Sequence, residues 1–361
     1  MADSNDLISF IASMAGEGSL RVEENLGEAY VRLRVAEAER RQAKHDIQHV
    51  EDVVIEMLRN ARDAGAQRIY LATQKEEGVR SLLFLDNGSG IPSDMHERVF
   101  DARVTSKLES MKMDRWGVHG RGMALYSIRQ NCDVARVVCS SPAKGSSIQV
   151  RVSTQHLNER ADQSSWPKVA KGEDGRWQVV SGPHNIIRTA SEFALDELHG
   201  TDVYLGSPTE IAATLFSHAV NDVDSSQLLF IDDFEDLPVV QRLACAVDAP
   251  SFIRIAASVG IDLSERTAHR ILAGSISPLR NLTSRLLRER DAVSREPRHI
   301  DLAKDRRGLK IAREDIEEFS RAMERDFSDL ADRYYLSLVG EPKVRVGKDK
   351  ITVTFDLDKG E

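Results

Sequence analysis

The chain has 361 residues, 41% hydrophobic and 30% charged, with a formal net charge of −9, so it has a globular rather than a disordered composition. It contains no run of about 18 apolar residues, which argues against a transmembrane helix, and its three cysteines lack the spacing of a metal site. The acidic start Met1–Asp6 does not resemble a signal peptide, so we expect a cytoplasmic protein with no membrane contact.

Residues 1–49 end in a charged segment with a helical pattern, from Leu26 to Arg41. We expect these 49 residues to form an N-terminal helical strap. Such a strap can make dimer contacts, or it can simply pack against the domain that follows.

Residues 50–64 have the pattern of an amphipathic helix. Its apolar positions are three and four residues apart: Val53, Val54, Met57, Leu58, Ala61 and Ala64. Glu56, Asn60 and Asp63 form a second stripe, because residues i, i+4 and i+7 share a helix face. Glu56 is therefore a candidate to orient or deprotonate a water, and Asn60 offers an oxygen to Mg²⁺. The same stripe also fits an ordinary solvated helix face.

Residues 81–91 read as a short strand that runs into the turn Asp86-Asn-Gly-Ser-Gly-Ile91. Asp86 lies where the strand ends, and a carboxylate accepts hydrogen bonds without donating, which suits the amino group of adenine. Gly88 and Gly90 would let the backbone come close to a base and adopt positive φ. An ordinary Asn-Gly hairpin turn has the same residues.

A glycine-rich loop precedes the apolar run that ends at Ile128. The loop and the residue after it are Gly117, Val118, His119, Gly120, Arg121, Gly122 and Met123. Glycines before a helix expose backbone N–H groups, and the helix N-terminus favours phosphate. The loop is not a Walker A motif, because no Gly-Lys-Ser/Thr follows. It does not fit a Rossmann fingerprint either, because a long loop rather than a strand precedes it.

Together and in this order, the three segments resemble the ATP-binding fold of DNA gyrase B, heat-shock chaperones, histidine kinases and MutL, the GHKL or Bergerat superfamily. The resemblance implies a Mg²⁺-dependent ATPase that binds ATP through these segments. It also implies a lid over the triphosphate, where Thr105, Ser106 and Lys107 resemble the lid of MutL. Gly200-Thr201 resembles the late strand of the fold, whose Thr contacts adenine or its water.

The expected fold class is α+β. A two-layer α/β sandwich of the Bergerat type spans residues 50–230, with an insertion near 155–195. A smaller helical domain follows over 237–330, similar to the helix-two-turns-helix domain of topoisomerase VI-B. Residues 331–361 are expected to form a C-terminal β-hairpin and tail.

The helical segment is also locally basic. Ser264–Arg313 holds 13 Lys or Arg against 6 Asp or Glu, which favours a nucleic-acid partner, although a basic face also docks on acidic domains. Residues 255–274 can alternatively be read as a helix-turn-helix with Gly260 in the turn. Arg266, His269 and Arg270 would then face the major groove.

Three functions fit these observations. The first is an ATP-gated conformational switch of the topoisomerase VI-B or MutL kind, hydrolysing ATP slowly through Glu56 and acting with DNA, a protein partner or a second copy of the chain. The second is a protein kinase of the histidine-kinase type, with His45 or His49 as acceptor. The third is a DNA-binding regulator with a silent ATP site.

The family's transducer domain, which carries the Lys that reaches the γ-phosphate, is not expected in the roughly thirty residues after Leu330. Lys107, Lys343, Lys348 and Lys350 are the candidates to replace that Lys.

Overall fold

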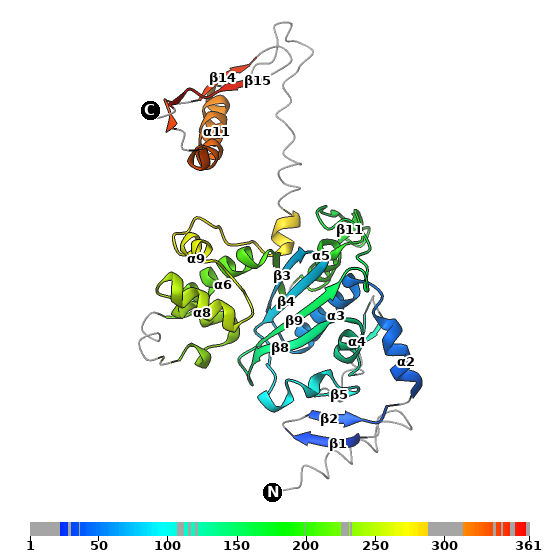
Figure 1. The fold of residues 1–361 in the computed structure, drawn as a ribbon. Coiled ribbons are helices and arrows are strands. Elements are labelled where there is room, and N and C mark those ends of the chain that lie inside the picture. The colour runs from blue at the N-terminus through cyan, green and yellow to red at the C-terminus, as the bar shows by residue number, and fades with distance from the viewer. Residues whose placement is uncertain are drawn as a thin grey trace. The chain divides into compact units, whose positions relative to one another are not determined.

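The computed structural model describes residues 22–27, 30–35, 37–106, 112–114, 117–119, 122–198, 200–224, 231, 233–287, 313–334, 337–340, 342–346 and 351–358. The chain divides into two compact units, Met1–Arg290 and Asp291–Glu361 (Figure 1). The candidate nucleotide-binding segments all lie in the first unit.

A mixed five-stranded sheet forms the centre of the first unit. The strand order is β12 (Asp202–Gly206), β3 (Arg68–Glu76), β4 (Val79–Asp86), β9 (Ser146–Ser153) and β8 (Val134–Ser140). β12 runs parallel to β3, and the other neighbours pair antiparallel. The predicted α+β class is confirmed.

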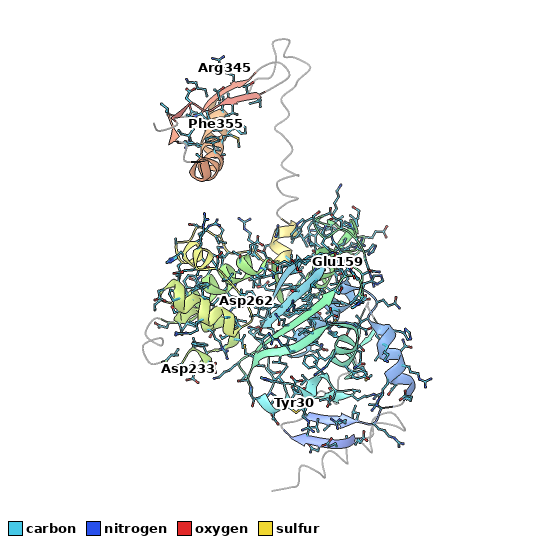
Figure 2. All side chains as sticks on the ribbon, viewed as in Figure 1. Tyr30, Glu159, Asp233, Asp262, Arg345 and Phe355 are labelled. Carbon is cyan, nitrogen blue, oxygen red and sulfur yellow. The ribbon has the colours of Figure 1, made fainter. Side chains whose placement is uncertain are left out.

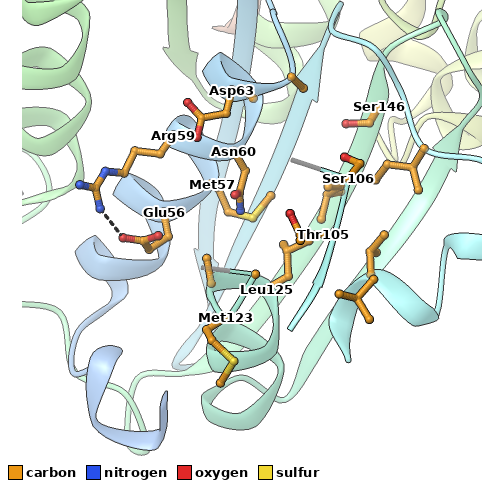
Figure 3. Close-up of a pocket in the computed structure, with 18 of the residues that line it drawn as sticks. Glu56, Met57, Arg59, Asn60, Asp63, Thr105, Ser106, Met123, Leu125 and Ser146 are labelled. Carbon is orange, nitrogen blue, oxygen red and sulfur yellow. Dashed lines mark hydrogen bonds and ion pairs between the residues drawn. The ribbon is translucent and has the colours of Figure 1, made fainter. Parts of the chain in front are cut away.

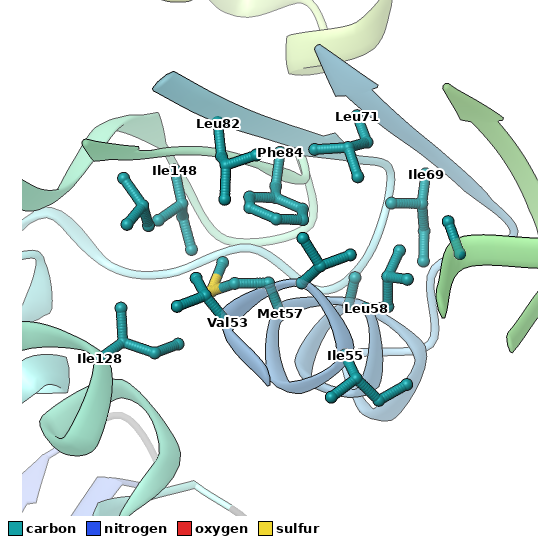
Figure 4. Close-up of a cluster of buried hydrophobic side chains, with 14 of the residues drawn as sticks. Val53, Ile55, Met57, Leu58, Ile69, Leu71, Leu82, Phe84, Ile128 and Ile148 are labelled. Atoms are coloured by element: carbon teal, nitrogen blue, oxygen red, sulfur yellow. The ribbon is translucent and has the colours of Figure 1, made fainter. Parts of the chain in front are cut away.

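Helices α3 (Val50–Asp63), α4 (Ala124–Asn131) and α5 (Ile186–Asp196) cover one face of this sheet (Figure 1). Strand side chains alternate between the two faces, so Leu82 and Phe84 of β4 point toward α3. Figure 4 shows Phe84, Leu71 and Leu82 packed over Met57 and Val53. This layer holds the larger part of the buried core.

The second face of the sheet is covered by the helical segment. Leu83 and Leu85, which alternate with Leu82 and Phe84, pack in a core with α6 (Pro208–Asp222), η4 (Val239–Cys245), α8 (Ala249–Ser258) and α9 (Glu265–Leu272). A strand buried on both faces reads as a continuous apolar run, as 82–85 does. The segment 237–287 thus adds a third layer to the two expected, inside the same compact unit as the sheet.

Local capping explains where these helices begin. Ser207 and Glu210 form a capping box before α6, with Pro208 in its first turn, and Asp248 accepts the Ser251 N–H at the start of α8. Gly260 has a φ of +91° in the connection from α8 to α9. No helix in the described ranges is long and apolar enough to cross a membrane.

The predicted helical strap is wrong in its first part. Residues 22–33 form two antiparallel strands, β1 (Val22–Gly27) and β2 (Tyr30–Leu33), and only Glu37–Asp46 is helical, as α2. β2 also pairs with β5 (Val104–Thr105), which gives a three-stranded sheet. The reason is the alternation Val31-Arg-Leu33, which buries two β-compatible side chains on one face.

The remaining elements of this unit are short. The insertion contains the hairpin β10 (Lys168–Lys171) and β11 (Trp177–Ser181), followed by α5. A second hairpin pairs β6 (Lys112–Asp114) with β7 (Gly117–His119). The 3-10 turns are η1 (Ser93–Met95), η2 (Arg98–Phe100) and η3 (Phe234–Asp236), and residues 282–287 form a further short helix.

The second unit consists of a helix and two small strand pairs. α11 runs over Arg313–Tyr334, β13 (Ser337–Leu338) pairs with β16 (Leu357–Asp358), and β14 (Lys343–Val346) pairs antiparallel with β15 (Ile351–Thr354), where the sequence predicts a hairpin. The Phe327 ring of α11 stacks on Phe355, labelled in Figure 2, with centroids 4.3 Å apart.

Candidate functional site

A cavity of about 590 Å³ lies in the first unit, between α3, the end of β4 and the start of α4. This volume is in the range of small-ligand sites. Ten of the residues predicted to bind the nucleotide line it: Glu56, Asn60, Asp63, Asp86, Gly90, Ile91, Thr105, Ser106, Gly122 and Met123. Segments far apart in the sequence therefore meet at one cavity.

The polar stripe of α3 forms one wall. Figure 3 shows Glu56, Asn60 and Asp63 in succession along the helix. The opposite side of α3, including Val54 and Leu58, is fully buried in the core. The helix is therefore fixed in rotation, and its polar face is held toward the cavity.

Glu56 is paired with a buried arginine one turn later. Arg59 Nη1 donates to Glu56 Oε1 at 2.7 Å, and the Arg59 and Glu56 side chains are 3% and 21% exposed. A charge-assisted hydrogen bond of this kind restricts the carboxylate. The Glu56 side chain is thus oriented while it remains accessible from the cavity.

Asp63, at the end of α3, is part of a partly buried ion network. Its Oδ1 accepts a hydrogen bond from Arg62 Nε at 3.0 Å, and Arg62 also donates to Glu197 of the insertion at 3.2 Å. Burial lowers the pKa of the Arg62 guanidinium, but the Asp63 and Glu197 carboxylates outweigh it and raise that pKa. Asp63 is therefore held in place by a permanent cation.

Asp86 is 5% exposed at the end of β4. Its Oδ1 accepts the Gly88 N–H at 2.7 Å, and its Oδ2 accepts the hydroxyl of Ser146, which lies opposite it on β9, at 2.5 Å. Each carboxylate oxygen has two lone pairs, so Asp86 can still accept a hydrogen bond from a ligand.

The two glycines of the turn are required by close contacts within the protein. A Cβ at Gly90, whose φ is +72°, would lie 2.0 Å from the Ser141 carbonyl oxygen. A Cβ at Gly88 would lie 2.9 Å from the Ala64 carbonyl oxygen and from Asp86 Oδ1. Gly88 is not among the cavity-lining residues, and it acts by positioning Asp86.

A family described as "Histidine kinase-, DNA gyrase B-, and HSP90-like ATPase" matches residues 47–172, which include the cavity-lining parts of α3 and β4. This part of the chain belongs to the GHKL superfamily of ATPases.

Part of the chain is similar to the DNA mismatch repair protein MutL of Staphylococcus aureus strains Newman and JH1. Each is 37% identical over 107 residues, which cover 29% of this chain and 16% of MutL. The chain therefore matches less than a fifth of the length of these relatives. Among solved structures, a mycobacterial sensor histidine kinase, MprB, is 19% identical and covers 34% of this chain and 74% of its own, with a TM-score of 0.21. That score is too low to bear on the fold.

The Asn60 side chain fits a magnesium ligand in the GHKL domain. Its Nδ2 is buried and has no hydrogen-bond partner among the described residues. The two ends of an amide are interchangeable by a 180° rotation, so the side chain can present its oxygen instead. Since Mg²⁺ takes few protein ligands beside phosphate and water oxygens, a single Asn in the cavity suffices.

The predicted lid and phosphate loop are described only in part. Thr105, Ser106, Gly122 and Met123 line the cavity, whereas Lys107, Gly120 and Arg121 lie outside the described residues. The backbone of Gly117–His119 forms β7, so the first half of the glycine-rich segment is a hairpin strand rather than a loop entering a helix. The alternation of Gly117-Val-His119 is too short to predict this.

Thr201, the predicted contact to adenine or its water, is hydrogen-bonded within the protein. Its hydroxyl donates to the Ala66 carbonyl oxygen at 3.0 Å, in a buried position, and Thr201 is not among the lining residues. This bond joins the start of β12 to the turn between α3 and β3. Thr201 therefore supports the strand pairing of the sheet.

Several lining residues were not predicted from the sequence. Tyr30 comes from β2, Gln42 and Asp46 from α2, and Ser146 from β9. None of them lies in a motif. The pairing of Asp86 with Ser146 depends on the β4–β9 register, which local patterns do not reveal.

The proposed DNA contacts lie on the other side of the sheet from the cavity. Arg266, His269 and Arg270 are exposed on α9, whereas Ala268 and Ile271 are buried against the sheet layer. The exposed face of α9 is therefore basic, with Glu265 as its acidic neighbour.

Proposed function

We propose that the GHKL domain binds Mg-ATP in this cavity, hydrolyses it slowly and acts as an ATP-gated conformational switch. The observation that carries the proposal is the convergence of Glu56, Asn60 and Asp86 on one cavity. They supply a base, an amide ligand and an adenine acceptor, which are the groups that this chemistry requires.

Asp86 would mark the adenine end of the cavity. An ionised carboxylate accepts only, so it favours a base with an exocyclic amino group. The Gly88 N–H and the Ser146 hydroxyl hold the carboxylate in position before a ligand arrives. Binding then loses little entropy on the protein side.

Glu56 would act at the phosphate end. It orients a water and takes its proton as the water oxygen bonds to the γ-phosphorus and ADP leaves. Asn60 would hold a Mg²⁺ ion that neutralises phosphate charge, and the first turn of α4, whose Ala124 and Leu125 line the cavity, offers backbone N–H groups to the phosphates.

The N-terminal segment supports the switch part of the proposal. Tyr30 of β2 and Thr105 of β5 both line the cavity, and these strands are hydrogen-bonded to each other in the sheet that also contains β1. A ligand that contacts both strands can move this sheet, and with it a surface for a protein partner or a second copy of the chain.

A DNA partner is the second part of the proposal. The three exposed basic residues on α9, with a buried opposite face, favour phosphate contacts, and MutL, to which part of the chain is similar, is a DNA mismatch repair protein. The helical segment would then couple DNA to the sheet that carries the ATP site.

We predict that Asp86→Asn weakens ATP binding by about tenfold to a hundredfold, because one charge-assisted hydrogen bond of about 1.5–3 kcal/mol is lost. The amide offers a donor in place of an acceptor, so binding of inosine triphosphate, which has an oxygen at that position, should be retained or improved. Calorimetric titration of both nucleotides measures this. A parallel loss for both would contradict recognition of the amino group by Asp86.

We predict that Glu56→Ala reduces ATP turnover by about 10²–10⁴-fold, the usual contribution of a general base, with little change in ATP affinity. Glu56→Gln is the matched variant, since it keeps the side-chain size and can still accept from Arg59. Phosphate release and equilibrium binding are measured on the same preparations. Turnover that survives both substitutions would remove Glu56 from the mechanism.

We predict that the double variant Arg266→Ala, Arg270→Ala weakens binding to duplex DNA and lowers the slope of log K against log salt by about 2, close to one per lost phosphate contact. ATP turnover without DNA should not change. Arg136→Ala with Arg176→Ala removes two other exposed arginines and serves as control. Equal losses in both variants would indicate that α9 has no particular role.

A further inference from the structure

Ser127, in the second turn of α4, has a buried hydroxyl that forms no hydrogen bond in the described part of the chain. The residue is 2% exposed and lines the cavity, and its Oγ has no hydrogen-bond partner among the described residues. A buried hydroxyl without a partner is unfavourable, because it loses its hydrogen bonds to water. The position of the Ser127 hydroxyl at the cavity is therefore explained best by a partner other than the described residues.

Two other buried hydroxyls inside helices, those of Ser191 and Thr214, are hydrogen-bonded. Ser191 Oγ donates to the Ile187 carbonyl oxygen at 2.6 Å, and Thr214 Oγ1 donates to the Glu210 carbonyl oxygen at 2.7 Å. This bond to the preceding turn is the usual solution for Ser and Thr in helices. The corresponding carbonyl for Ser127, that of Met123, accepts the Ser127 N–H, at 2.8 Å, and not the Ser127 hydroxyl.

A second polar group without a partner faces the same cavity from the neighbouring helix. The Nδ2 of Asn60 is also buried without a partner in the described residues, and α3 packs against α4. With the Asn60 amide turned so that its oxygen faces a Mg²⁺ ion, the Ser127 hydroxyl is the donor of the pair, and a donor fits an anion bound beside that ion. The charge of the nearby Glu56 carboxylate is already compensated by Arg59, so it does not exclude an anion.

We propose that the Ser127 hydroxyl is a further nucleotide-binding group, which donates a hydrogen bond to an oxygen of the phosphate chain. The inference rests on the proposed function. It assigns the phosphates to the α4 side of the cavity, since the acceptor Asp86 serves the base and the donors of α4 serve an anion.

The test compares Ser127→Ala with Ser191→Ala, which removes a buried helical hydroxyl that is already bonded. Binding of ATP and of adenosine to the full chain is measured by calorimetry, and the stability of the ligand-free protein by urea unfolding. Ser127→Ala should lower ATP affinity about tenfold, leave adenosine affinity unchanged and not lower the stability of the free protein. Ser191→Ala should lower that stability and leave ATP affinity unchanged.

Wild-type affinity for ATP in Ser127→Ala would overturn the inference and leave the proposed function intact. So would an equal loss for ATP and adenosine, because the substitution would then act on the shape of the cavity and not on a phosphate contact. A wild-type protein that binds neither ligand would overturn the proposed function, and the inference with it.

Discussion

The burial of β4 on both faces is the constraint on which the site depends. Leu82 and Phe84 pack against α3, and Leu83 and Leu85 pack against the helical segment. A shift of the strand by one residue would therefore bring either Ser81 or Asp86 into the apolar core. Asp86 is the next residue along the same strand. The packing of four apolar side chains therefore places the Asp86 carboxylate at the edge of the sheet. The core also fixes the rotation of α3, so that Asn60 and Glu56 face the same cavity.

Some buried polar groups of the cavity have hydrogen-bond partners within the protein, and others have none among the described residues. Asp86 accepts the Gly88 N–H and the Ser146 hydroxyl, and Glu56 accepts from Arg59. The Asn60 amide nitrogen and the Ser127 hydroxyl have no partner among the described residues, at a cost of about 1–3 kcal/mol for each unsatisfied group. A ligand that satisfies both regains that free energy on binding. The apolar core thus tolerates unsatisfied polar groups at the cavity, as expected for a surface that binds a ligand.

Sequence patterns predicted the parts of the site that depend on local periodicity. The stripe Glu56, Asn60 and Asp63 follows from helical spacing, and Asp86 from a strand that ends in Asn-Gly. The N-terminal strands were not predicted. The charged residues there have a helical periodicity over a longer stretch than the short strand-like alternation at Val31 and Leu33, so the sequence pattern favoured a helix. Tyr30 reaches the cavity only through the pairing of β2 with β5, and Ser146 only through the β4–β9 register. Strand pairings between distant segments cannot be predicted from local sequence patterns.

Hydrogen–deuterium exchange of the full chain, with and without Mg-ATP, tests the central claim most directly, because it locates the ligand without a substitution. We expect slower exchange at residues 86–91, at 104–106 and in the first turn of α4, which line the cavity from three sides. The buried half of α3 should change little, since its amides are already protected. Unchanged exchange in all three segments, or protection confined to α8, α9 or the second unit, would contradict the assignment of this cavity to ATP.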